Sequence, residues 1–169
     1  FSCAGRKDAD KKIFRYNQPE GIASLDPAFA KNQAIMWGVH QLFNTLVEVD
    51  EKLQIKPSLC RRWMVSDDWL TYTFILRDDV YFHDNPAFPG GKGRKMIAAD
   101  VAYSLQRIIS TTTASPGAWI FNNRIDTADG FTALNDTTFK SMHGILNDFP
   151  ILYWVYSVCN IVLLCLMKL

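Results

Sequence analysis

The sequence predicts a mixed α/β fold, and three observations indicate it. Residues 29–46 and 98–109 have apolar residues at helical spacing, and residues 70–76 alternate in the manner of a β-strand. With 49% hydrophobic and 21% charged residues, the 169-residue chain has the composition of a globular domain with a core. Its net charge of +1 and the lack of a basic stripe predict no nucleic-acid partner.

The first part of the chain predicts a strand followed by a helix. Residues 13–18 favour a short strand, which ends at the Pro-Glu-Gly sequence of residues 19–21. A turn at residues 24–27 then leads into the helix of residues 29–46, whose wide apolar face predicts packing into a core. His40 lies among these apolar residues, which favours a buried structural histidine over a ligand-binding one.

The middle of the chain predicts a short strand at residues 47–49, a short helix and a β-hairpin. Residues 57–64 begin with a proline and favour two helical turns, with Cys60 inside the helix as a small apolar side chain. The alternating strand of residues 70–76 is followed by two aspartates that favour a turn. Residues 80–83 are then expected to return as the second strand of a hairpin.

The last part of the periodic region predicts a helix and a second pair of strands. The helix of residues 98–109 has Asp100 in its first turn and Arg107 near its end, as the helix dipole favours. A loop follows at residues 111–117. Residues 131–140 then predict two short strands about an Asn-Asp turn.

Catalytic and metal-binding patterns are not evident. The aspartate pairs at 67–68 and 78–79 are adjacent in sequence and point apart, so solvated turn charges are favoured over paired catalytic carboxylates. The GGKGRK sequence within residues 84–95 lacks phosphate-loop spacing and favours a basic surface loop. The four cysteines form no CxxC pair, and whether they form disulfides is left open. We expect no enzyme activity, no metal and no cofactor.

Taken in order, these segments resemble the signature of family 5 extracellular solute-binding proteins. The pattern runs from a leading proline and an aromatic residue through Tyr-x-Phe-x-Leu-Arg and an apolar-x-Phe-x-Asp turn to Ala-x-Asp-Val-x-x-Ser-x-x-Arg. Its positions are held here by Pro57, Trp63, Ser66, Tyr72, Phe74, Leu76, Arg77, Val80, Phe82, Asp84, Ala98, Asp100, Val101, Ser104 and Arg107. The resemblance covers residues 13–140. It departs from the family at Cys60, where alanine is usual, at Ile97, where a capping serine or threonine is usual, and in a longer loop at 85–95.

The resemblance implies a periplasmic binding protein fold of type II, of which this chain is expected to be an N-terminal fragment. It would hold part of lobe I and an α+β extra subdomain that includes most of residues 25–140. Family members are binding proteins whose two lobes close on an extended peptide and deliver it to an ABC permease in the inner membrane. The ligand's identity is left open between peptides, nickel chelates, haem and oligosaccharides.

The family's peptide is held mainly by its backbone, as an added strand. The matching residues here follow the first predicted strand, and they are Asn17, Gln18, Pro19, Glu20, Gly21 and Ile22. The resemblance also implies a ligand contact for Trp119, in the segment 115–119. A packing role for this aromatic side chain is given equal weight. Half of a two-lobe clamp is expected to bind peptide only weakly.

The two ends of the chain carry separate predictions. Phe-Ser-Cys followed by a lysine-rich stretch resembles the end of a bacterial lipoprotein signal, which predicts a lipid on Cys3, a tether over residues 1–12 and a periplasmic, membrane-anchored location. A free cysteine in a frayed terminus is the alternative.

Residues 141–169 no longer resemble the family. Residues 151–169 are 19 residues with one charge near the end, which suits a transmembrane helix. That interpretation gives an alternative function, a small membrane-anchored protein whose soluble part binds a partner. With suitable codons, however, a shifted reading frame over residues 152–162 encodes VLGILSMQYC, which resembles the family's own continuation. The second interpretation is therefore a frameshift near residue 140, which leaves an apolar tail with no evolved fold.

Overall fold

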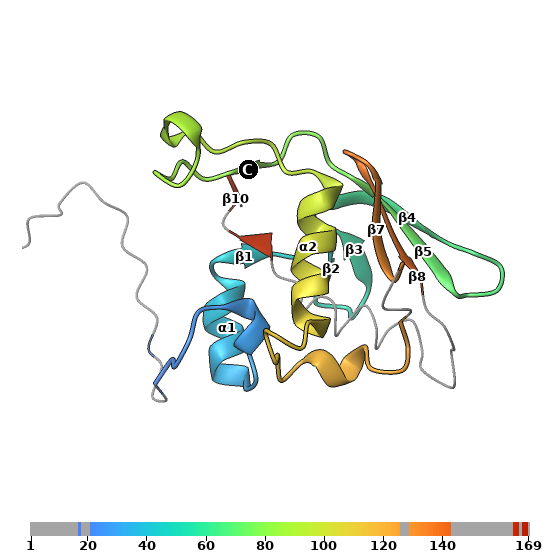
Figure 1. Ribbon diagram of the computed structural model, residues 1–169, viewed down its shortest axis with the longest axis horizontal. Helices are drawn as coiled ribbons and strands as arrows, with labels where there is room; N and C mark the ends of the chain where they lie inside the picture. Colours follow the sequence, from blue (N-terminus) through green and yellow to red (C-terminus); the bar gives the residue numbers. More distant parts are fainter. Residues whose placement is uncertain (1–16, 18–20, 126–128, 143–163, 166, 169) are drawn as a thin grey trace, which may run out of the picture.

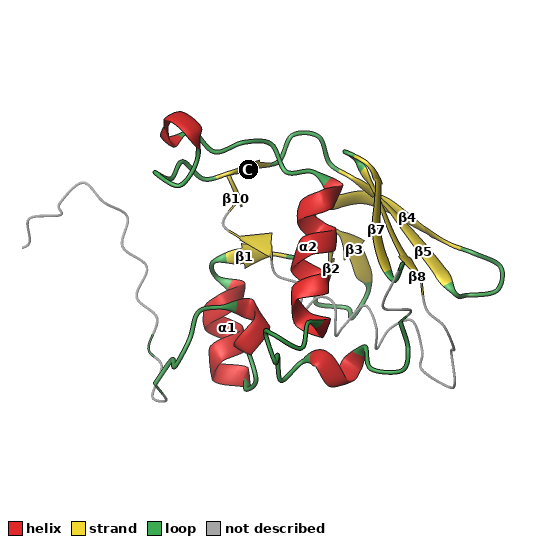
Figure 2. Cartoon of the chain, in the orientation of Figure 1, coloured by secondary structure: helices red, strands yellow, loops and turns green. Residues whose placement is uncertain are grey.

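The computed structural model describes residues 17, 21–125, 129–142, 164–165 and 167–168. Figures 1 and 2 show a helical part beside a twisted sheet. The elements in chain order are η1 (Pro27–Phe29), α1 (Gln33–His40), β1 (Phe43–Asn44), β2 (Val47–Val49), β3 (Ile55–Pro57), β4 (Cys60–Val65), β5 (Thr71–Leu76), β6 (Tyr81–Phe82), η2 (Pro89–Gly91), α2 (Ala98–Ile109), η3 (Ala118–Ile120), β7 (Phe131–Asn135), β8 (Thr138–Met142), β9 (Leu164–Cys165) and β10 (Met167–Lys168).

The core lies between α2 and a four-stranded antiparallel sheet of order β4-β5-β8-β7 (Figure 1). On β5, alternate residues are buried, and Tyr72, Phe74 and Leu76 form the inner face. Leu105 of α2 and Phe139 of β8 belong to the same buried cluster, and the Phe74 and Phe139 ring centroids lie 6.0 Å apart. Burial of this apolar face holds α2 against the sheet.

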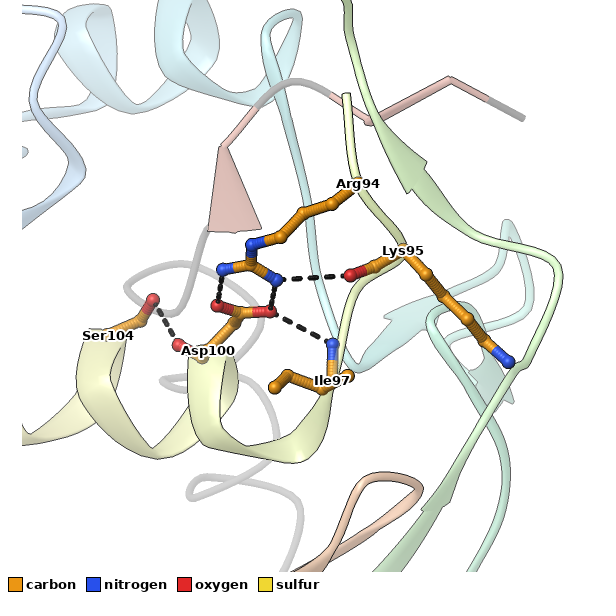
Figure 3. A network of polar contacts seen from close by, with 5 residues as sticks. All are labelled: Arg94, Lys95, Ile97, Asp100 and Ser104. Carbon is orange, nitrogen blue, oxygen red and sulfur yellow. Dashed lines mark hydrogen bonds and ion pairs between the residues drawn. The ribbon is translucent and has the colours of Figure 1, made fainter. Parts of the chain in front are cut away.

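The predictions for α2, for β2 and for the β7–β8 pair are confirmed. The helix spans the predicted residues 98–109, although Ile97 has no polar side chain with which to cap it. The carboxylate of Asp100 instead accepts a hydrogen bond from the Ile97 amide at 2.9 Å, and Ser104 donates to the Asp100 carbonyl at 2.8 Å (Figure 3). The acidic residue in the first turn thus supplies one half of a capping box, although the residue at the N-cap has no polar side chain to supply the other half.

The predicted helix over residues 57–64 is wrong. Cys60–Val65 form the edge strand β4, which pairs with β5 along its length. The register shifts between Cys60 and Arg62, so the strand contains a bulge, and two consecutive arginines are exposed. Because a bulge interrupts the period-two alternation, the sequence of these residues does not show the pattern of a β-strand.

The predicted hairpin between residues 70–76 and 80–83 is also wrong. β5 pairs with β4 on one side and with β8 on the other. After β5, the Arg77 amide donates to the Leu59 carbonyl at 2.9 Å, and the Arg77 guanidinium binds Asp79, so the chain leaves the sheet instead of turning back. Asp79 is an exposed ion-pair partner, in line with a solvated charge.

The predicted helix over residues 29–46 is shorter than expected. Asn32 caps α1 through its side-chain oxygen, which accepts from the Ile35 amide at 2.9 Å, and the helix ends at the half-buried His40. Ile35 packs in a small cluster near α1, whereas Leu46 is buried in the main core. The helical spacing of apolar residues therefore extends beyond the end of α1, because Leu46, after the helix, is buried in the main core and not on the helix face.

The two ends of the chain are described only in part. β8 continues to Met142, and the C-terminal strands β9 and β10 pair antiparallel with β1 and β6. The described residues include no helix that is long and apolar enough to cross a membrane. Most of the predicted span at 151–169, the tether at 1–12 and all of the predicted strand at 13–18 except Asn17 lie outside the described residues.

Candidate ligand-binding site

The turn before η1 is built by local side-chain hydrogen bonds. Ser24 Oγ accepts from the Asp26 amide and Asp26 Oδ1 accepts from the Ala28 amide, both at 3.0 Å. Pro27 occupies the first helical position, where its missing N–H costs nothing. The chain that follows the predicted ligand-binding segment is thus fixed by its own sequence.

An ion pair ties this turn to α2. The Arg107 guanidinium binds both carboxylate oxygens of Asp26, with Nη1 at 2.9 Å from Oδ1. The hydrogen bond from Arg107 lowers the pKa of Asp26, although partial burial opposes the shift. About a third of each side chain is exposed, 36% for Arg107 and 31% for Asp26, so water screens the pair only in part.

A second long-range contact joins η1 to the segment that contains Trp119. The buried Ser115 donates its hydroxyl hydrogen to the Ala28 carbonyl at 2.6 Å and accepts from the Gly117 amide at 3.1 Å. Trp119 lies two residues beyond, on η3, with 57% of the residue exposed. The structure therefore brings the 115–119 segment beside the turn that follows Ile22.

The predicted ligand-binding residues are described in part. Asn17, Gly21 and Ile22 are exposed, whereas the remaining three, Gln18, Pro19 and Glu20, lie outside the described residues, as does Cys3. Ile22 is 39% exposed and contacts α1, since its Cδ1 lies 3.1 Å from where a Cβ would stand on Gly38. A glycine at this point of α1 lets the segment that contains Ile22 approach the helix closely.

Exposed apolar side chains gather in the same part of the chain. Ile22, Leu25, Phe29 and Trp37 are all at least 38% exposed, and Trp119 joins them through the Ser115 contact. A concentration of exposed apolar groups marks a surface that binds a ligand or another part of a protein. Trp119 is therefore not a core aromatic among the described residues, and its contact with a ligand stays a prediction.

Sequence reasoning missed a cavity of about 690 Å³ between η1, β1, β6 and α2. Its walls are largely apolar. Two ion pairs, Asp26–Arg107 and Arg94–Asp100, lie at its border. Arg94 Nη1 lies 2.7 Å from Asp100 Oδ2 (Figure 3). The guanidinium carbon of Arg94 lies 4.9 Å from the Phe82 ring centroid. No local sequence pattern could have indicated this cavity, because its walls come from four separate elements.

The described residues hold no group of three or more histidine, cysteine or acidic side chains that could bind a metal ion. Cys60 is a free thiol, and burial raises its pKa to about 11. A thiol that is protonated at neutral pH is a poor nucleophile and a poor metal ligand.

Comparison with known proteins identifies the family of this chain. The profile described as "Bacterial extracellular solute-binding proteins, family 5 Middle" matches residues 54–142. The periplasmic murein peptide-binding protein of Escherichia coli K12 is 36% identical over 97 residues, which are 57% of this chain and 16% of that protein. The heme-binding protein A of Haemophilus influenzae is 43% identical over 103 residues, 60% of this chain and 18% of that protein.

A solved structure gives the same result for the fold. The ABC transporter-associated periplasmic binding protein of Helicobacter pylori, in complex with the peptide STSA, superposes with a TM-score of 0.67 and 26% sequence identity, covering 84% of this chain and 28% of that one. This chain thus spans less than a third of that structure and less than a fifth of the two curated relatives. The fold is that of part of a type II periplasmic binding protein, and the chain belongs to the family 5 bacterial extracellular solute-binding proteins.

Proposed function

We propose that this chain is part of a solute-binding protein that captures an extended peptide for an ABC importer in the bacterial cell envelope. The family match supports the binding role, and two of the three relatives described above are named for a peptide or were solved with one. The permease of such an importer is the expected protein partner. Since the chain spans only a small part of its relatives, the proposal concerns the part of the ligand site that these residues build.

The observation that carries the proposal is that Gly21 and Ile22 are exposed residues outside the helices and strands of the structure. Among the described residues, no strand pairs with this segment. The turn that follows it is fixed to α2 by Asp26–Arg107 and to the 115–119 segment by Ser115. An exposed segment that is not paired in a sheet can accept an added peptide strand, because main-chain hydrogen bonds supply affinity for many side-chain sequences.

Trp119 is proposed as the aromatic contact beside that strand. Its large surface costs few rotamers to order, which suits a pocket that accepts varied side chains. Asn17, Gln18, Pro19 and Glu20 are proposed to extend the same peptide-binding edge toward the N-terminus.

The proposal is tested by a heteronuclear NMR titration of the full chain with a mixture of tri- to pentapeptides. We expect chemical-shift changes at the Gly21 and Ile22 amides and at the Trp119 indole, with weak affinity of about 1 mM or above because the opposing lobe is not contributed by these residues. The indole of Trp69 is the internal control: it is similarly exposed, at 53%, but lies on the turn between β4 and β5. Shifts at Trp69 without shifts at Gly21, Ile22 and Trp119 would contradict the proposal.

A lipid on Cys3 is proposed as the anchor that keeps the protein at the membrane. Mass spectrometry of the N-terminal peptide from membranes of producing cells should show a diacylglyceryl group on Cys3. The Cys3→Ser variant should leave the membrane fraction. An unmodified Cys3 in protein taken from membranes would refute the proposed lipid anchor.

A further inference from the structure

Two very short strands border the cavity between η1, β1, β6 and α2. Phe43 of β1 and Phe82 of β6 both line it. In register, Phe43 stands opposite Cys165 of β9, and Phe82 stands opposite Met167 of β10. Two strands that lie far apart in the sequence are therefore bridged by residues only two positions apart near the C-terminus (Figure 1).

Strands β1 and β6 each pair through one edge with the C-terminal segment. One edge of β6 pairs with residues 94–95, because the Phe82 amide donates to the Arg94 carbonyl at 2.9 Å and Tyr81 forms a bridge with Lys95. β10 takes the opposite edge. Among the described residues, β9 is the strand that pairs with β1.

We propose that β1 and β6 form a strand-addition site for an extended apolar segment, separate from the peptide-binding edge at Gly21–Ile22, and that strands β9 and β10 of this chain fill it. The family match ends at residue 142, so the segment that fills the site lies outside the matched region. This agrees with recognition through the main chain, which is insensitive to the exact side chains of the added strand.

The chemistry of the site selects an apolar occupant. Its walls include Phe43, Phe82, Phe88 and Ile108, and the arginines at its border are paired with carboxylates. The sequence Leu-Leu-Cys-Leu-Met before Lys168 has the matching apolar composition. An extended apolar strand that crosses from β1 to β6 would satisfy both main-chain edges and cover the cavity.

Proline substitution separates main-chain recognition from side-chain recognition. Antiparallel pairing alternates the residue that donates, so both residues of each strand are replaced: Leu164→Pro with Cys165→Pro for β9, and Met167→Pro with Lys168→Pro for β10. The matched controls carry alanine at the same positions. The readout is amide hydrogen exchange by mass spectrometry over residues 41–46 and 79–84, with the central strand β5 as the internal reference for folding.

We expect the β9 prolines to speed exchange over residues 41–46 by about tenfold, and the β10 prolines to do the same over residues 79–84. The alanine variants should stay within about threefold of the parent, and β5 should stay protected throughout. A synthetic peptide with the sequence of residues 163–169, carrying serine at position 165 and extra lysines for solubility, should restore protection to a chain with all four prolines.

Three results would overturn the inference: proline variants that exchange like the parent, alanine variants that lose as much protection as the proline variants, or no recovery with the peptide. These outcomes are independent of the Gly21–Ile22 titration, because the two sites involve different residues.

Discussion

The ion pair between Asp26 and Arg107 should couple the turn before η1 to α2 by about 1 kcal/mol of unfolding free energy. Replacing Arg107 by alanine removes a bidentate, partly buried pair and should cost about 1 kcal/mol. Replacing Asp26 by alanine removes the same pair and also the cap on the Ala28 amide, so it should cost about 2 kcal/mol. The double variant should then lose about 2 kcal/mol, less than the 3 kcal/mol expected by addition, since the pair can be lost only once.

Urea unfolding of the four proteins of this double-mutant cycle measures the coupling. Arg61→Ala is the control, because the Arg61–Asp78 pair is more than half exposed, at 56% and 52%, and should contribute less than about 0.5 kcal/mol. Additive losses for Asp26→Ala and Arg107→Ala would refute the reasoning, since they would mean that the two side chains do not interact in solution.

The same pair gives a pH dependence with a definite sign. The pKa of Asp26 is lower in the folded protein than its ordinary value, mainly because Arg107 donates to the carboxylate. Its contribution to stability is therefore complete above the ordinary pKa, about pH 4, and disappears as the pH falls through the lower folded value. The coupling should be present at neutral pH and vanish in strong acid; an unchanged coupling there would contradict an ionic origin.

Three further predictions concern the fold. Trp69 has a left-handed backbone, with φ of 61°, and Trp69→Gly should raise stability by up to about 1 kcal/mol, seen as a thermal midpoint a few degrees higher; a lower midpoint would show that its side-chain contacts outweigh the strain. Leu105→Ala should lower the unfolding free energy by about 2–5 kcal/mol in urea, because it opens a cavity between α2 and the sheet; a loss below 1 kcal/mol would contradict that packing. Cys60, with its pKa raised to about 11, should resist iodoacetamide at pH 8 in the folded chain and react after unfolding, as followed by peptide mapping; equal labelling in both states would contradict its burial.

Local sequence patterns predicted the elements whose partners are near in sequence. The helix of residues 98–109 has an apolar face, an acidic first turn and a basic last turn that all agree, and its bounds were predicted correctly. The β7–β8 pair was also predictable, because its two strands flank a short Asn-Asp turn. In both cases the determining interactions lie within one element or between neighbours.

The failures have the opposite character. The sequence of β4 predicts a helix because a bulge near Cys60 disrupts the strand's alternation. The predicted partner of β5 is wrong because its real partner, β8, comes about 60 residues later in the chain. The candidate site depends on Asp26 with Arg107 and on Ser115 with Ala28, pairs separated by 81 and 87 residues. A single sequence does not show which residues so far apart along the chain are in contact. The resemblance to a family therefore gave a predicted ligand-binding segment but not the contacts that fix the turn after it.

The most direct test of the proposed role is a chimera of the E. coli periplasmic murein peptide-binding protein in which the aligned stretch of this chain replaces the relative's own residues. Calorimetry with murein tripeptide should give a dissociation constant within about tenfold of the parent, because the proposed peptide-binding edge would be supplied by this chain in place of the relative's own residues. In the same chimera, Trp119→Ala should weaken binding further. A chimera that folds with the parent's circular dichroism spectrum but does not bind the peptide would contradict the account.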